Sequence, residues 1–230
     1  TSEPDSGDTN SDDGDAGDGA SCGRVAEAIE GTQTAQLFAE VATWIDTVGK
    51  NDEHQPFLLW VHARGMDGAW DAPVELRNSL VEEDEPAPPQ DARVPREQLD
   101  ENHDPDRLHG AACAYAGQVM ALDVCVGALM NLLRECSLLE NTLVIWGGEF
   151  GRTPKISNRA ARDHWPRCYF SIWAGAGIEP GRVIGQSDKL GEDPLSDPYP
   201  PLMVGTTIAE LAGVDTQARA EMKVLEGGKV

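Results

Sequence analysis

The sequence predicts an α/β fold with a mainly parallel sheet. Two observations lead to this prediction. Segments with helical and strand-like apolar patterns alternate from residue 34 onward, and 40% of the 230 residues are hydrophobic, which is enough for one packed core. Helices that alternate with strands are typical of parallel sheets, because each helix serves as the crossover between two strands.

Three segments have the apolar spacing of amphipathic helices, namely residues 34–49, 108–137 and 203–212. Short apolar runs bounded by Pro, Asn or Gly are typical of buried strands. Such runs predict strands at 56–62, 142–146 and 168–174, and residues 182–185 have the composition of a further short strand.

The formal net charge is −22, and acidic residues are concentrated in two stretches. Residues 1–23 hold seven acids and no base, with very few apolar residues, and we expect a disordered acidic tail or linker there. Residues 82–106 hold ten acids, two bases and five prolines, which predicts a mobile insertion. Residues 24–230 would then form the α/β domain.

The charge also excludes classes of partner. Nucleic-acid binding and docking on an anionic membrane both need a basic surface, so we expect neither. The apolar runs are shorter than a bilayer requires, and we therefore expect no membrane span. The chain begins with Thr1 rather than Met, which we interpret as a processed protein or a fragment.

A basic island interrupts this acidic sequence. Residues 152–167 contain five bases and one acid. Local positive charge attracts small anions, and arginine suits the oxygens of sulfate, phosphate or carboxylate. The island follows the predicted strand at 142–146, and ligands collect at the carboxyl ends of strands in open sheets. We therefore predict that Arg152, Lys155 and Arg162 bind an anion.

Glu149, Asp163 and His164 add carboxylate oxygens and an imidazole to this region, and they are the candidate ligands of a metal ion. Two structural alternatives stay open. The arginines could pair with the acidic residues of 82–106, or Glu149 could be a buried acid that is neutralised by Arg152.

His62 and Asp67 follow the predicted strand at 56–62 and are weaker candidates at the rim of the site. A histidine at the end of a strand is commonly a surface residue with a satisfied hydrogen bond. Asp67 could equally cap a turn after Gly65.

Several motifs carry a family resemblance. Residues 56–73 (PFLLWVHARGMDGAWDAP) and 115–144 (YAGQVMALDVCVGALMNLLRECSLLENTLV) resemble the middle of sulfatases. Residues 141–230 resemble an uncharacterised bacterial family related to sulfatases, through GEFGRTPK (148–155), RDHWP (162–166) and GRVIGQSDKLG (181–191). The resemblance covers about three quarters of the chain.

The resemblance implies an alkaline-phosphatase-like α/β/α sandwich, of which this chain carries a part. It also implies metal-assisted hydrolysis of sulfate or phosphate esters with a divalent ion, Ca²⁺ or Zn²⁺, and export to the periplasm or the extracellular space. Glu149, Asp163 and His164 would hold the metal. Arg152 and His164 would be the catalytic residues.

The chain departs from sulfatases in several places, of which two bear most directly on catalysis. The Cys/Ser-x-Pro-x-Arg nucleophile motif is missing, and Phe150 stands where sulfatases have a metal-binding Asn. Two functions therefore stay open. The chain is either part of a hydrolase that acts on a small anionic or sulfated substrate, or a non-catalytic sulfatase-like module that binds an anionic ligand or partner.

Overall fold

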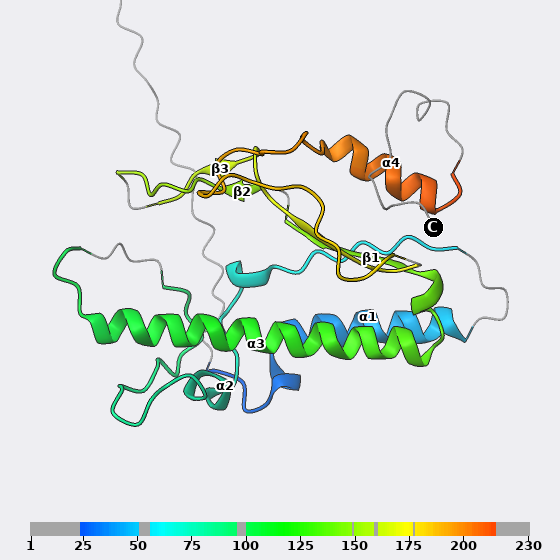
Figure 1. The fold of residues 1–230 in the computed structure, drawn as a ribbon. Helices are drawn as coiled ribbons and strands as arrows, with labels where there is room; N and C mark the ends of the chain where they lie inside the picture. Colours follow the sequence, from blue (N-terminus) through cyan, green and yellow to red (C-terminus); the bar gives the residue numbers. More distant parts are fainter. Residues whose placement is uncertain are drawn as a thin grey trace, which may run out of the picture. The chain divides into compact units, whose positions relative to one another are not determined.

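The computed structural model describes residues 24–50, 56–95, 100–148, 150–158, 161–176 and 178–214 (Figure 1). The chain divides into two compact units. The first contains Arg64–Pro95, Asp104–Ala121 and the described part of Thr1–Gln33, and the second contains the rest. The expected acidic tail, residues 1–23, lies outside the described residues.

The helices are α1 (Gln33–Gly49), α2 (Val74–Asn78), α3 (Pro105–Glu135) and α4 (Pro201–Leu211). The strands are β1 (Leu143–Gly147), β2 (Gly151–Arg152), β3 (His164–Trp165) and β4 (Ser171–Gly175). Short 3-10 helices cover Ile29–Gly31, Gly65–Asp67 and Leu139–Asn141.

The prediction of a mainly parallel sheet, and with it the α/β/α sandwich, is wrong. The strands of the described residues form two antiparallel pairs, β1 with β4 and β2 with β3. A parallel pair needs a crossover connection, usually a helix. In the described part of the chain between β1 and β4 there is a hairpin and no helix, so the chain returns antiparallel and Leu143 lies opposite Gly175.

The strand prediction at 56–62 is also wrong. These residues have no regular secondary structure, and none of the backbone hydrogen bonds among the described residues involves them. The side chains of Leu58 and Trp60 are 87% and 85% exposed. The composition favours a strand, but a strand also needs a neighbour to pair with. Residues 182–185 likewise form no strand.

The three helix predictions are confirmed, with shifted ends. In α1, Val41 and Ile45 of the predicted apolar face are buried, together with Phe38, whereas Trp44 of that face is exposed. α3 begins at Pro105, three residues before the predicted start, because proline is well suited to the first turn of a helix. α4 begins at a proline for the same reason.

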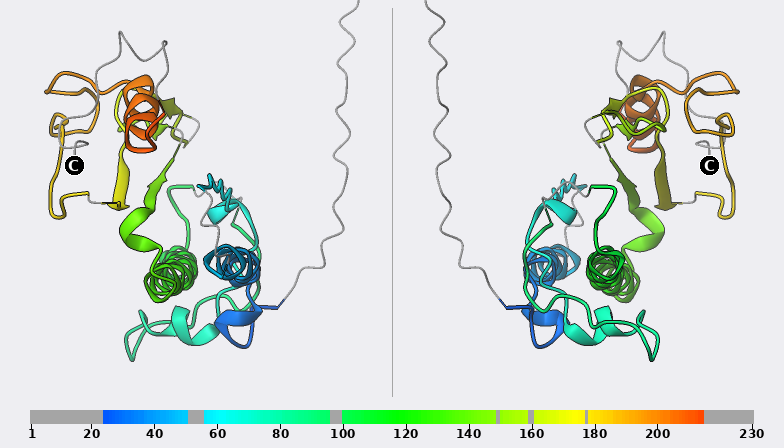
Figure 2. Two further views of the ribbon diagram at one scale, coloured as in Figure 1. Left: turned by 90° about the vertical axis from the view of Figure 1, so that its right-hand side faces the viewer. Right: turned by 90° about the vertical axis from the view of Figure 1, so that its left-hand side faces the viewer.

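The core of the second unit lies between α1 and the C-terminal half of α3, which lie side by side in Figure 2. Val41 and Ile45 of α1 pack with Leu133 of α3. Partly buried residues of α3, of the turn after it and of β1 surround these three; they are Leu129, Met130, Leu132, Leu138, Leu139 and Val144. Through Val144, β1 packs against the helices, and this contact positions the strand that leads into the basic island.

The first unit is built around the guanidinium group of Arg77 in α2, which is 1% exposed. Arg77 Nε donates to the carbonyl oxygen of Ala72 (3.2 Å), and Nη1 donates to that of Asp91 (3.1 Å). The same group donates to the carbonyl oxygens of Trp70 and Pro89. One side chain thereby joins two separate loop segments to α2.

A second buried polar group in this unit links the loop before α2 to two helices. The Asp71 carboxylate accepts a hydrogen bond from the backbone N–H of Gln33 (2.8 Å), the first residue of α1. The buried Gln118 of α3 accepts one from the backbone N–H of Ala72 (2.9 Å). Buried polar atoms are therefore paired here, as a stable core requires.

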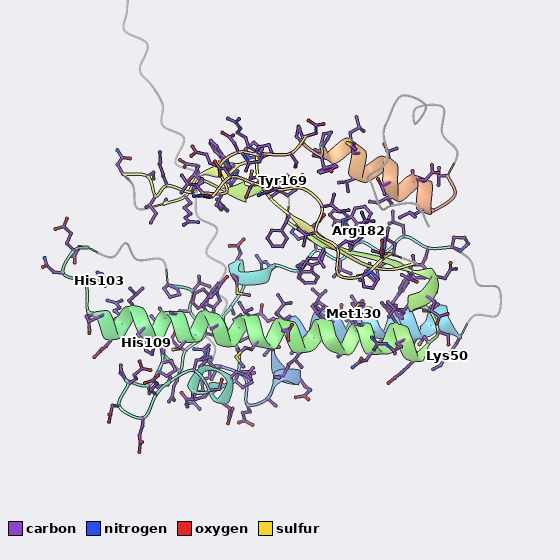
Figure 3. All side chains as sticks on the ribbon, viewed as in Figure 1. Lys50, His103, His109, Met130, Tyr169 and Arg182 are labelled. Carbon is purple, nitrogen blue, oxygen red and sulfur yellow. The ribbon has the colours of Figure 1, made fainter. Side chains whose placement is uncertain are left out.

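The predicted acidic insertion contacts the start of α3. His109, labelled in Figure 3, lies on α3 with its Nε2 atom 3.0 Å from a carboxylate oxygen of Glu85. Pro89 packs closely against Gly110 of the same helix. These contacts hold part of 82–106 against α3, while the mobility of the segment stays a prediction.

α3, with 31 residues, is long and apolar enough to cross a membrane by length and composition. The core helix of a soluble protein passes the same test, so this is weak evidence for a membrane span. The expectation of no span stays a prediction.

Candidate functional site

The basic island forms a β-hairpin in the second unit. Gly151 lies opposite Trp165 and Arg152 opposite His164. Beyond the two strands, the backbone N–H of Thr153 donates to the carbonyl oxygen of Asp163 (3.0 Å). The Thr153 hydroxyl accepts a hydrogen bond from the N–H of Asp163 (3.1 Å) and donates one to the carbonyl oxygen of Lys155 (3.0 Å). The hydroxyl therefore fixes the path of the chain at the base of the loop.

Gly151 is required by close backbone packing. A Cβ atom at this position would overlap the carbonyl oxygen of Cys168 and lie 3.1 Å from that of Trp165. Any side chain would push β2 away from the segment that leads to β4. Gly151, the second glycine of the GEFGRTPK motif, therefore has a steric role.

One face of the hairpin carries Phe150, Arg152 and His164, which we term the arginine face. The ring of Phe150 lies 3.8 Å from the His164 ring between centroids, at 31°. The guanidinium carbon of Arg152 lies 5.6 Å from the centroid of Phe150. Arg152 Nη1 also donates to the carbonyl oxygen of Arg162 (3.4 Å). Arg152 and His164 are exposed, so their donors are open to a ligand from solvent.

The opposite face of the hairpin borders an open hollow of about 220 Å³. Neighbouring residues of an extended chain point to opposite sides, so Asp163 and Trp165 lie on the other face from His164. The hollow is lined by Thr153, Pro154, Lys155, Ile156, Ser157, Asp163, Trp165 and Glu192. It contains two carboxylates, one ammonium group and one indole.

Residues 186–196 anchor the hairpin at two points. The indole N–H of Trp165 donates to the carbonyl oxygen of Glu192 (2.7 Å), and Arg167 forms an ion pair with Asp193 (2.5 Å). The loop itself is held by Asp188, whose carboxylate accepts backbone hydrogen bonds from Glu192 (2.8 Å) and Leu190 (3.1 Å). The bond from Glu192, above all, lowers the pKa of Asp188, although desolvation opposes the shift.

The predicted metal ligands do not form a site within the described residues. Glu149 lies outside them. Asp163 and His164 point to opposite faces of the hairpin. Among the described residues, three His, Cys, Asp or Glu side chains nowhere come together in a way that could hold a metal ion. The Ca²⁺ or Zn²⁺ site stays a prediction that depends on Glu149.

The predicted anion-binding residues are divided between the two faces. Arg152 lies on the arginine face, and the exposed Arg162 is adjacent to His164 in the sequence. Lys155 lines the hollow instead. Within the described part of the chain, none of these three forms an ion pair, whereas Arg167 is bound to Asp193. Asp193 lies outside 82–106, and no base of the island forms an ion pair with that segment among the described residues. The other alternative, a buried Glu149 neutralised by Arg152, falls on a residue outside the described ones.

The two rim candidates lie outside the hairpin. His62 is exposed in the irregular segment after Trp60, in the second unit. Asp67 is exposed at the end of the 3-10 helix Gly65–Asp67, in the first unit.

Sequence reasoning missed Phe150, Trp165 and Glu192 as site residues. The sequence does contain a pattern that could have revealed the first two, because side chains alternate between the faces of an extended chain. Positions 150 and 152 share one face of their strand, and positions 163 and 165 share one face of the partner strand. Glu192 carries no such signal, since a loop that is distant in the sequence brings it to the hollow.

Comparison with known proteins identifies one family. Residues 106–224 match the family described as "Protein of unknown function (DUF1501)". Searches of curated proteins and of solved structures find no match. The matched range contains most of α3 and the whole hairpin.

Proposed function

Because the chain belongs to the DUF1501 family, whose description assigns no activity, we propose a function from the hairpin itself: the chain binds a small oxyanion, a sulfate or phosphate group or an ester of one, on the arginine face. The observation that carries this proposal is the cross-strand pair of Arg152 and His164. Neither has an acidic partner among the described residues.

The chemistry of these groups supports an anion. A guanidinium group presents parallel N–H donors that match two oxygens of sulfate or phosphate. One N–H group of Arg152 is used by the carbonyl oxygen of Arg162. This bond and the packing on Phe150 orient the remaining donors before a ligand arrives, which reduces the entropy lost on binding.

The test is a titration of the chain with sulfate, phosphate and an aryl sulfate. Binding is measured by calorimetry or from the NMR signals of the backbone amides in 150–165. Hydrogen bonds to charged groups contribute about 1.5–3 kcal/mol, so we expect Arg152→Ala to weaken binding at least about tenfold. Arg134→Ala, which removes an exposed arginine of α3 in the same unit, is the control and should have no effect. Equal loss in both variants would mean non-specific attraction and would contradict the proposal.

Hydrolysis of the bound ester is the second candidate function, and the resemblance of GEFGRTPK and RDHWP to sulfatase-related sequences supports it. The described residues do not bring together the ligands of a metal ion, so this function is assigned to the side chains of the hairpin alone. Turnover of an aryl sulfate or phosphate that is lost in His164→Ala would support a hydrolase. Binding without turnover would leave an anion-binding module.

A further inference from the structure

The hollow on the face opposite Arg152 is a second candidate site with different chemistry. We propose that it binds a single neutral sugar ring. The proposal does not depend on the anion site, because the two sets of side chains lie on opposite faces of the hairpin. It is carried by the kinds of group that line the hollow, by their lack of partners and by the size of the space.

The charged groups of the hollow are of both signs. Among the described residues, the side chains of Lys155, Asp163 and Glu192 form neither a hydrogen bond nor an ion pair with one another or with any other group. They offer carboxylate acceptors and an ammonium donor to the same space. A ligand that satisfies all of them needs donors and acceptors together, which hydroxyl groups provide. The lining carries two negative charges and one positive charge, so it disfavours a simple anion and leaves a cation as the competing ligand.

Trp165 adds an apolar surface that is held in place. Its N–H group is used by the carbonyl oxygen of Glu192 (2.7 Å), and the guanidinium carbon of Arg167 lies 6.0 Å from the ring centroid. A large, rigid aromatic side chain with its polar atom already paired presents an apolar surface. The C–H side of a pyranose can pack on such a surface while its hydroxyl groups reach the charged side chains.

The size of the hollow limits the ligand. Its volume of about 220 Å³ is below the range of about 300–1,000 Å³ that is usual for drug-sized ligands. One ring fits this space better than a chain of rings. Because the hollow is open to solvent, we expect weak binding.

The experiment is an NMR titration of the full chain with glucose, galactose and mannose, read from the indole N–H of Trp165 and the amides of Thr153 and Ser157. We expect saturable shifts with at least one sugar. Asp163→Ala should weaken that binding at least about threefold, which corresponds to a typical single hydrogen bond. Trp165→Ala should abolish it. Glu140→Ala, an exposed acid in the same unit, should leave it unchanged.

Trp165→Ala could also unfold the hairpin, so Asp163→Ala is the decisive variant. Its side chain lines the hollow, whereas only its backbone holds the hairpin. Retained phosphate binding in either variant would show that the arginine face is intact. The proposal would be overturned if none of the three sugars caused a shift, or if the shifts in Asp163→Ala equalled those of the unchanged protein. Methylamine is the cationic comparison. Saturable shifts with methylamine but not with the sugars would also overturn the proposal. Loss of phosphate binding in Arg152→Ala would bear only on the anion site.

Discussion

At the scale of single residues, Arg77 stabilises the first unit through geometry more than through charge. Burial lowers the pKa of its guanidinium group, while the charges of Asp91 and Asp71 oppose the shift. Four carbonyl oxygens, from two loop segments, depend on this one side chain as their donor. The planar fork of arginine reaches several acceptors at once, which lysine cannot do.

We therefore expect Arg77→Lys to destabilise the protein although the charge is kept. Each buried carbonyl that loses its donor costs about 1–3 kcal/mol, and the total should be about 3 kcal/mol or more. Denaturant unfolding, with a probe in the first unit, measures the loss. Arg134→Lys on the exposed side of α3 is the matched control, for which a change below about 0.5 kcal/mol is expected. Similar small effects of both substitutions would contradict this role.

Asp188 gives a prediction for pH. Its pKa is lowered in the folded protein, chiefly by the backbone N–H of Glu192. Its hydrogen bonds are therefore fully present above the unfolded value of about 3.9 and are lost as the pH falls through the depressed folded pKa. The amide signals of Leu190 and Glu192 should titrate with a midpoint below 3.9, and Asp188→Asn should remove this step. A midpoint at the ordinary value would disprove the assignment.

At the scale of elements, two glycines of α3 allow the effect of close packing on stability to be distinguished from the effect of helix propensity. A Cβ atom on Gly117 would lie 2.9 Å from Cγ of Arg77, because α2 packs directly on this turn. A Cβ atom on Gly127 would have no neighbour within 4 Å. The same substitution in the same helix should therefore have effects of opposite sign.

Alanine is more favourable than glycine in a helix interior by about 1 kcal/mol, whereas overpacking costs about 1–3 kcal/mol. We expect Gly127→Ala to stabilise the protein by up to about 1 kcal/mol. Gly117→Ala should destabilise it despite the gain in propensity. Thermal unfolding of the two variants tests this, and a stabilised Gly117→Ala would show that α2 does not pack here.

The hairpin offers a similar pair of glycines. Gly151→Ala should displace β2 from Cys168 and thereby weaken anion binding by the arginine face. Gly148→Ala is the matched control, because its Cβ atom would lie 3.8 Å from the nearest atom, the carbonyl oxygen of Phe150. The same phosphate titration measures both. Unchanged binding in Gly151→Ala would mean that the backbone contact is not needed for the site.

At the scale of the whole molecule, the net charge opposes association between molecules, whereas exposed apolar surface favours it. A net charge of −22 keeps molecules apart. The uncharged apolar run 57–61, however, has exposed Leu58 and Trp60, and its backbone forms no hydrogen bond with another described residue. Exposed runs of this composition tend to pair with the same run in other molecules.

We expect aggregation to start from this run. Leu58→Lys with Trp60→Lys should slow aggregation, as followed by light scattering, although it reduces the net negative charge. Val183→Lys, at another highly exposed apolar position in the second unit (93%), is the control for added charge. It should have little effect. Equal slowing by both variants would place the aggregating surface elsewhere.

Sequence reasoning predicted the helices because their signal is local. The apolar spacing that places Val41 and Ile45 on one side of α1 is present in the sequence and needs no knowledge of the partner. The strands at 142–146 and 168–174 were also predicted, to within a few residues. Their antiparallel pairing was not, because orientation depends on the connection between them.

The candidate site was predicted only in part, because local patterns show single residues but not the contacts between distant segments. Local charge revealed Arg152, but grouping Asp163 with His164 ignored the alternation of side chains in a strand. Glu192 could not be predicted, since a loop about 30 residues further along the chain brings it to Trp165. Contacts across such distances are set by the whole fold rather than by any local pattern.

The hairpin also constrains how the gene can change. Residues of the two faces are interleaved along the chain, so the loss of the Gly151 codon would shift β2 by one residue and place Arg152 opposite Trp165. That shift would turn Arg152 toward the hollow and Thr153 toward His164. Point substitutions can alter either face separately, whereas single-codon insertions and deletions alter both at once. Homologous sequences should therefore vary in the identity of these residues far more readily than in their spacing.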